Sequence, residues 1–474
     1  MHLADLPVEI SENILDYLPR HAKQQCLLVS KLWHQATLPG LNRYIQLLGN
    51  EDVLILYRKM FHPPVTIKGS DIRCLSLTVE KVSDRYIVRR DVLGPILNAC
   101  VHLRTLHLLH DSNQFLEYMY QARSELHVDA LQTIYIPFNV VNRVIRDMEF
   151  RAIFHYCQKI TQISLNTNRY TAVRDIPDNM DLTNYLSKFT CLQTLAIHFD
   201  NELILHDIIS ACPQLESLRL FGASFLSLTT KLRMYRTDSA TEKPVFSVKS
   251  QLHTLFIDTT FFSKDLLEYL AIHTTHFYQL TLCGSVSRGT QNLVTAFTAY
   301  SQQPRLNALA LKCIRFENHL SYSNELMQHI KHCFSSSLRR INFTQCDFND
   351  IRDDGNNLTL DLTGLNLDYL TIDIQNVLEG RIASLNKTSL EVTTTNNAIP
   401  KTVYFQRKSK WKPENLFLLK QSNQYTNQNA QKRRLKSDHT CVLAIKADSI
   451  HYIKLHCHNQ DSRQPFSQIV NLGA

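Results

Sequence analysis

The chain has 474 residues, of which 44% are hydrophobic and 20% charged, and its formal net charge is +8; this length accommodates about three ordinary domains or one long array of repeats. No run of about 18 apolar residues occurs, which argues against a transmembrane helix, and Asp5, Glu9 and Glu12 are not expected in a secretion signal or transit peptide. The 12 cysteines lie at least 13 positions apart, so CxxC pairs for zinc or redox chemistry are excluded, and reduced thiols in the cytoplasm, the nucleus or both are expected.

Two short amphipathic helices are predicted at the N-terminus. Pro7 suits the first turn of a helix, and Ile10 and Ile14 then recur at helical spacing until Pro19 ends the helix. A second helix is expected to carry Ala22, Cys26, Val29 and Trp33 on one face. A module of this size buries too little of its own apolar surface. We therefore expect it to dock on a partner or on the rest of the chain.

The order of Leu6-Pro7-Val8-Glu9 and Val29-Ser30-Lys31-Leu32-Trp33 resembles an F-box, the small helical module that binds the Skp-type adaptor of a cullin–RING ubiquitin ligase. Ala22 and Lys23 depart from the family pattern, which has an acidic and then an apolar residue there. An ordinary amphipathic hairpin is the alternative interpretation. The resemblance implies an F-box domain over 1–48, with adaptor-binding residues Leu6, Pro7, Glu9, Ile10, Ile14, Val29, Leu32 and Trp33.

A six-residue pattern, apolar-x-x-apolar-x-apolar, then recurs along the chain. Its first positions run from 72 to 367 over ten intervals, a mean of 29.5 residues. Alternation at the last three positions predicts a strand with one apolar side, and helical sequence lies between the strands. The pattern occurs at Ile72/Leu75/Leu77, Leu103/Leu106/Leu108, Leu131/Ile134/Ile136, Ile160/Ile163/Leu165, Leu192/Leu195/Ile197, Leu215/Leu218/Leu220, Leu252/Leu255/Ile257, Phe277/Leu280/Leu282, Leu306/Leu309/Leu311, Leu338/Ile341/Phe343 and Leu367/Leu370/Ile372.

One strand and one helix at this period resemble a leucine-rich repeat. The resemblance implies an α/β solenoid over 49–474, with parallel strands on its concave face and helices on its convex face. The expected core includes Leu106, Leu195, Leu218, Leu255 and Leu309. Cysteines that follow the same period are expected to be buried core thiols, with reactive or metal-binding roles as the alternative: Cys100, Cys157, Cys212 and Cys346.

Three segments interrupt the regular pattern. Residues 229–249 form a polar stretch that is expected to be an insertion on the rim. Residues 405–438 contain nine Lys or Arg and two acidic residues, which is +7 of the net +8, and are expected to be a disordered basic loop. Nuclear import or an acidic partner is the alternative role for that loop. The remainder of 373–474 is interpreted as degenerate repeats and a cap.

Catalytic motifs are absent from the sequence. The segment from Gly284 to Thr290 is similar to a phosphate-binding loop, but Thr290 stands where the lysine is required. His456 and His458 would share one face of a strand, yet no second pair of metal ligands accompanies them. No metal, nucleotide or other cofactor is expected.

The two resemblances together imply a non-catalytic substrate receptor of an SCF-type ubiquitin ligase. Its expected partners are a Skp-type adaptor, the cullin and RING subunits bound through it, and a protein substrate; membrane and nucleic acid are not expected. A non-degradative scaffold and a nuclear factor acting through the basic loop are the alternatives. Arg219, Phe256, Arg340 and Tyr369 are the large side chains at strand positions that face the concave side, so we predict substrate contacts there.

Overall fold

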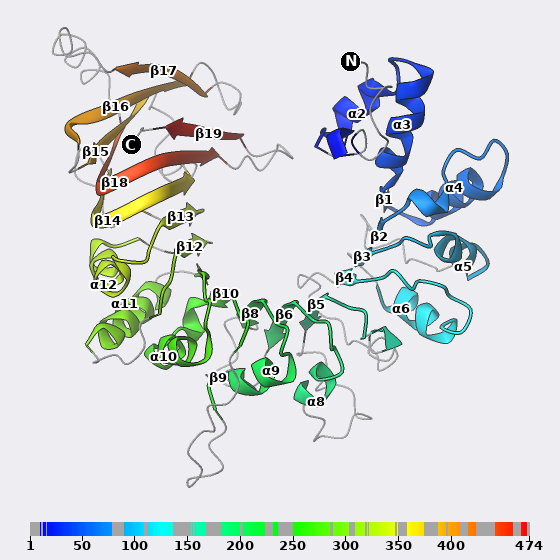
Figure 1. Ribbon diagram of the computed structural model, residues 1–474, viewed down its shortest axis with the longest axis horizontal. Helices are drawn as coiled ribbons and strands as arrows, with labels where there is room; N and C mark the ends of the chain where they lie inside the picture. The colour runs from blue at the N-terminus through cyan, green and yellow to red at the C-terminus, as the bar shows by residue number, and fades with distance from the viewer. Residues whose placement is uncertain are drawn as a thin grey trace. The chain divides into compact units, whose positions relative to one another are not determined.

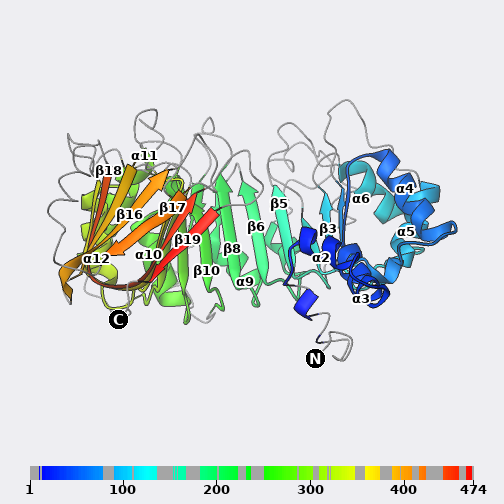
Figure 2. The same cartoon turned by 90° about the horizontal axis from the view of Figure 1, so that it is seen from above.

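The computed structural model describes part of the chain, as two compact units. The N-terminal unit comprises 1–215 and 222–230, and the C-terminal unit comprises 216–221 and 231–474. Both contain parallel strands with helices on one side of the sheet (Figures 1 and 2). The described residues are 10, 13–15, 17–77, 90–108, 112–135, 153, 155–156, 158–166, 182–199, 202–222, 231–235, 250–284, 288–302, 309–317, 320, 322–346, 348, 358–373, 387–394, 397–407, 416–422, 441–457 and 466–471.

The N-terminal unit begins with short helices and continues as strand–helix repeats. Strands β1 to β6 pair in chain order, and every pairing is parallel. The elements are α2 (Arg20–Cys26), α3 (Lys31–Asn42), β1 (Tyr44–Leu47), α4 (Asn50–Phe61), η2 (Gly69–Asp71), β2 (Cys74–Leu77), α5 (Arg90–Ala99), β3 (Thr105–Leu108), α6 (Ser112–Gln121), β4 (Thr133–Tyr135), β5 (Gln162–Asn166), α8 (Leu182–Leu186), β6 (Thr194–Phe199), β7 (Glu202–Ile204) and α9 (Leu205–Ala211).

The sheet of the N-terminal unit starts earlier than the repeat pattern indicated. Strand β1 pairs with β2 in parallel, with Ile45 opposite Leu75 and Leu47 opposite Leu77. Buried Asn42 stands at the position where later repeats have an apolar residue, so a search for three apolar positions does not find this first repeat. The sheet therefore begins at Tyr44, inside the 1–48 segment expected to be purely helical.

The C-terminal unit continues the same construction and ends in longer strands. Strands β8, β10, β11, β12, β13, β14 and β18 pair in parallel, in that order. Its elements are β8 (Ser217–Gly222), β9 (Lys231–Arg233), β10 (Thr254–Asp258), η4 (Thr259–Phe261), α10 (Lys264–His273), β11 (Gln279–Cys283), α11 (Arg288–Ser301), β12 (Cys313–Glu317), α12 (Asn324–Phe334), β13 (Arg340–Thr344), β14 (Leu358–Asp373), β15 (Lys387–Thr394), β16 (Asn397–Arg407), β17 (Leu416–Ser422), β18 (Cys441–Cys457) and β19 (Phe466–Asn471).

Ten of the eleven predicted strand positions are confirmed, and one is wrong. The strand expected at Leu306/Leu309/Leu311 lies instead at Cys313–Glu317, where Ile314 pairs with Leu280 on one side and Ile341 on the other. Leu311, Ile314 and Phe316 fit the same apolar pattern as the predicted triplet. The 14-residue helix α11 lengthens this repeat, so the assumption of a constant period selected the wrong triplet.

The C-terminal hundred or so residues contain more strand than expected. Strand β18 pairs with both β14 and β15 in parallel, β16 pairs with β15 in antiparallel, and β19 pairs with β18 in antiparallel. Strand β17 pairs with β16 through residues in the 405–438 segment, such as Arg407 with Leu416. The prediction of a continuous disordered loop is thus wrong for 405–407 and 416–422. The 229–249 segment likewise contains the short strand β9.

The apolar side of each strand supplies the core. Leu106, Leu195 and Leu218 are fully buried, and Leu255 and Leu309 are 1% and 5% exposed, which confirms all five core predictions. Phenylalanines fill the space between later repeats of the C-terminal unit: the rings of Phe316 and Phe343 stack with centroids 5.3 Å apart. Among the described residues, no helix is long and apolar enough to cross a membrane.

Two core cysteines should be nearly unreactive in the folded protein. Cys100 is 0% and Cys212 2% exposed, and burial raises the pKa of each thiol to about 12. Because the thiolate is the reacting species, we expect both to be labelled at least about 100-fold more slowly than half-buried Cys191. Mass spectrometry after timed maleimide labelling measures this, and rapid native labelling of both would contradict the core register. Cys157 lies outside the described residues.

Candidate functional site

The helical hairpin exposes an unusual amount of apolar surface. Tyr17 is 91%, Leu28 81% and Val29 65% exposed, while Ile10 and Ile14 are 46% and 41% exposed. These five residues, here called the hairpin surface, lie within 20 positions of one another. Exposed apolar side chains scattered singly are ordinary, whereas a concentration of them is typical of a binding surface, which makes the hairpin surface a candidate site.

Local sequence explains why the hairpin presents these side chains. Leu15 is buried at 2% exposure, whereas its neighbour Ile14 is 41% exposed. Pro19 occupies the N-cap of α2, and the Ser30 hydroxyl caps α3 by accepting a hydrogen bond from the Trp33 N–H at 3.3 Å. The expected single helix through Val29 is therefore wrong. Leu28 and Val29 lie in the turn between α2 and α3, where both are largely exposed.

The predicted adaptor-binding residues divide into three groups. Ile10, Ile14 and Val29 lie on the hairpin surface, and Trp33 is half-buried on α3. Leu32 lies on α3. Leu6, Pro7 and Glu9 lie outside the described residues. The predicted adaptor-binding residues do not include Tyr17 and Leu28, the two most exposed apolar residues of the described hairpin, although Tyr17 recurs at helical spacing after Ile10 and Ile14.

A second candidate surface is the side of the C-terminal sheet opposite its helices, here called the strand face (Figures 1 and 2). Parallel register places equivalent residues of successive strands side by side. The four predicted substrate-binding residues all belong to this face, as two neighbouring pairs: Arg219 stands opposite Phe256, and Arg340 stands opposite Tyr369.

Each of these arginines lies over an aromatic ring. The guanidinium carbon of Arg219 is 5.9 Å from the ring centroid of Phe256, which also contacts the ring of Phe221 at 4.8 Å. The guanidinium carbon of Arg340 is 5.0 Å from the centroid of Tyr369. Such cation–π contacts orient a guanidinium and leave its N–H groups available for an acceptor.

The second pair is extended by a residue of β18, where Ile450, Ile453 and Leu455 repeat the apolar pattern of β14. Tyr452 of β18 stacks on Tyr369 with centroids 5.0 Å apart and an interplanar angle of 19°. Strand β18 follows β14 in the sheet although more than 60 residues separate them in the chain, since β14 ends at Asp373 and β18 begins at Cys441. The resulting Arg340–Tyr369–Tyr452 ladder crosses three neighbouring strands.

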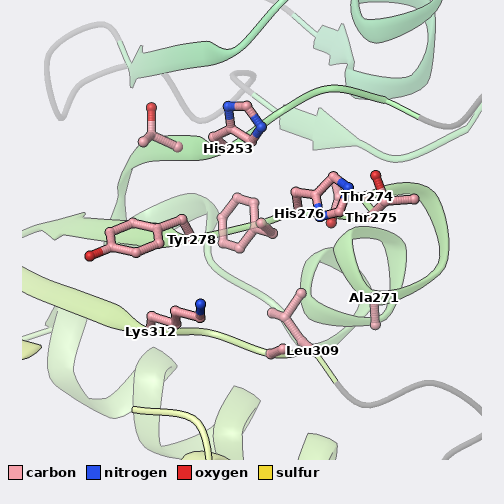
Figure 3. Close-up of a pocket in the computed structure, with 11 residues that line it drawn as sticks. His253, Ala271, Thr274, Thr275, His276, Tyr278, Leu309 and Lys312 are labelled. Carbon is pink, nitrogen blue, oxygen red and sulfur yellow. The ribbon is translucent and has the colours of Figure 1, made fainter. Parts of the chain in front are cut away.

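A pocket of about 630 Å³ opens where strands β10, β11 and β12 begin (Figure 3). His253, Tyr278 and Lys312 are the residues immediately before these three strands, so the repeat itself brings them together. The backbone carbonyl of His253 accepts from the Tyr278 N–H at 2.8 Å, and that of Tyr278 accepts from the Lys312 N–H at 3.1 Å. None of the described residues that line the pocket is acidic.

Metal-binding and redox arrangements are not found in the described part of the chain. No group of three or more His, Cys, Asp or Glu residues there is placed to hold a metal ion. His451 Nδ1 lies 3.6 Å from the Asp368 carboxylate, and His458 lies outside the described residues. Cys313 on the strand face is buried, which raises its pKa to about 11 although Arg315 and Arg340 partly oppose the shift. These observations leave the hairpin surface and the strand face as the candidate sites.

Comparison with known families finds a match that covers the hairpin. Residues 3–38 match the family model of the F-box domain, which confirms the sequence interpretation of the hairpin and includes Leu6, Pro7 and Glu9. The match ends before β1 and leaves the repeated sheet outside it. A search of curated proteins found no match to the chain.

Proposed function

We propose that this chain is the substrate-binding subunit of an SCF-type ubiquitin ligase. The observation that carries the proposal is the F-box domain at 3–38, whose hairpin leaves five large apolar side chains exposed. A Skp-type adaptor would cover that surface and connect the chain to cullin and RING subunits. Such a complex would act in the cytoplasm, the nucleus or both.

We interpret the sheet and helices over 49–474 as a leucine-rich repeat domain that binds a protein substrate. Parallel strands in register, apolar residues at the three pattern positions and a helix between most strands support this interpretation. Only stacked neighbours can cover the apolar side of each repeat. The opposite side of the strands is then available for binding, because core packing does not constrain it.

The proposed contribution to ubiquitin transfer is positioning. A substrate held by the chain meets the ubiquitin-loaded conjugating enzyme within one complex, so an encounter between separate molecules becomes an intramolecular step. No side chain of this chain needs to touch the thioester. F-box proteins generally act in this way, as receptors without chemistry of their own.

Affinity purification of the tagged chain with proteasome inhibition tests the proposal. We expect a Skp-type adaptor, a cullin and a RING subunit to co-purify. The double variant Leu6→Ala with Pro7→Ala should lose at least about 90% of the adaptor, because the F-box resemblance places both at the interface. Adaptor without cullin would instead indicate a non-degradative scaffold. Adaptor recovery by the double variant at the wild-type level would contradict the assignment of these residues.

A further inference from the structure

The strand face of the C-terminal unit separates charge by row. Three rows cross its strands: residues two, four and six positions after the first apolar residue of each repeat. The first and second rows contain four cations, Arg219, Arg315, Arg340 and Lys454, and no acidic residue. The third row contains the acids Asp258, Glu317 and Asp373 and no Lys or Arg. The first two rows of the described strands therefore offer a ligand cationic side chains and no acidic ones.

The N-terminal unit lacks this feature. On the described strands β1 to β6, the equivalent first two rows contain no Lys, Arg, Asp or Glu. Their members are Tyr44, Cys74, Thr105, Thr133, Gln162, Thr194, Gln46, Ser76, His107, Tyr135, Ser164 and Ala196. The cationic rows are thus a local property of β8 to β18, where repeats of the same construction carry different outward residues.

Only one of the four cations, Arg315, has an acidic partner among the described residues. Among the described residues, Arg219 and Arg340 are exposed and form cation–π contacts but no ion pair. Arg315, in contrast, lies 3.0 Å from the Glu317 carboxylate and is half-buried. Arginines held over aromatic rings lose less side-chain freedom when they bind an anion, and their planar N–H groups suit a carboxylate.

We propose that the strand face of β8 to β18 binds an extended, Asp/Glu-rich segment of the substrate, with Arg219 and Arg340 each receiving a carboxylate. The proposal rests on the proposed function in treating the ligand as a substrate. Beside Arg340, the stacked rings of Tyr369 and Tyr452 would contact the apolar parts of the ligand. The rings of Phe221 and Phe256 would do the same beside Arg219.

The spacing of the two arginines favours carboxylates over a single phosphate group. Four strand steps separate β8 from β13, which corresponds to about 19 Å at ~4.8 Å per step. Phosphate sites gather several arginines around one group, whereas here each exposed guanidinium has its own aromatic support. An extended chain that rises about 3.3 Å per residue spans this distance in about six residues.

The third row argues against nucleic acid as the ligand. Asp258 and Glu317 lie beside the cationic rows and would repel a continuous phosphate backbone. A peptide can place its carboxylates over Arg219 and Arg340 and neutral residues between them. The acidic third row would repel the carboxylates of the peptide, and this repulsion would keep the peptide over the first two rows.

Fluorescence anisotropy with the purified full chain tests the proposal. The probe is a fluorescein-labelled Gly/Ser peptide with two Glu pairs about six positions apart, and a second probe replaces every Glu by Gln. We expect the Gln probe to bind at least about tenfold more weakly, and added salt to weaken the Glu probe because it screens exposed charges. A third probe carries phosphoserine in place of Glu.

Charge-reversal variants locate the site. Arg219→Glu and Arg340→Glu should each weaken the Glu probe by on the order of tenfold. Arg58→Glu, on the exposed side of α4 in the N-terminal unit, should leave it unchanged. Arg340→Lys keeps the charge but not the planar fork, and should weaken binding less than the reversal does. Circular dichroism melting of each variant identifies any loss of folding.

Several outcomes would overturn the proposal: equal affinity for the Glu and Gln probes, binding of the phosphoserine probe alone, no binding of any probe, or an equal effect of Arg58→Glu. Adaptor binding is measured on the same preparations. A chain that binds adaptor but not the Glu probe loses only this inference. A chain that binds the probe through Arg219 and Arg340 but binds no adaptor retains the acidic-peptide site and loses the proposed function.

Discussion

The double variant Leu28→Glu with Val29→Glu is expected to lose binding to a Skp-type adaptor, with an affinity at least about 100-fold weaker than that of the wild type. Both side chains are exposed in the turn between α2 and α3, at 81% and 65%, so neither contributes to a core that the change could disrupt. Covering them with a partner would bury two carboxylates without counterions, which is costly. Isothermal titration with purified adaptor measures the change.

Ile272→Glu is the matched control for the hairpin variant. Ile272 is 47% exposed on α10 of the C-terminal unit, so it tests the effect of a new charge on an exposed apolar residue away from the hairpin. We expect wild-type adaptor affinity for this control and unchanged far-ultraviolet circular dichroism for both proteins. Wild-type affinity in the Leu28/Val29 variant would show that the adaptor contacts a different surface.

Leu218→Ala and Leu255→Ala are each expected to lower the free energy of unfolding of the C-terminal unit by ~2–5 kcal/mol. The two residues stand opposite one another on β8 and β10, with 0% and 1% exposure, so each truncation removes buried apolar contacts and leaves a cavity. Urea denaturation followed by circular dichroism measures the loss. Because the residues are in contact range, the double variant should deviate from the sum of the two single changes.

Ile272→Ala provides the comparison for the core truncations. The side chain is 47% exposed, and a change of less than about 1 kcal/mol is expected. If Leu218→Ala and Leu255→Ala were no more destabilising than this control, the assignment of the apolar pattern to the core would be wrong.

The hairpin and most strands could be predicted from the sequence because their signals are local. A strand with one buried side needs apolar residues at every second position, and Leu106 and Leu108 satisfy this within one short segment. The same holds for the ordered Leu-Pro-x-Glu and Val-Ser-Lys-x-Trp segments of the F-box domain at 3–38. Local patterns of this kind specify which side chains are buried together before any long-range pairing is known.

Pairing partners, in contrast, were decided by the tertiary structure. The overlapping triplets Leu306/Leu309/Leu311 and Leu311/Ile314/Phe316 have the same local pattern, and only alignment with β11 and β13 selects the second. The stacking of Tyr452 on Tyr369 depends on β18 returning beside β14, which no local period encodes. Strand register depends on hydrogen bonds and packing between residues distant in the chain. Sequence therefore determined the repeating unit, while long-range pairing decided which outward side chains became neighbours on the strand face.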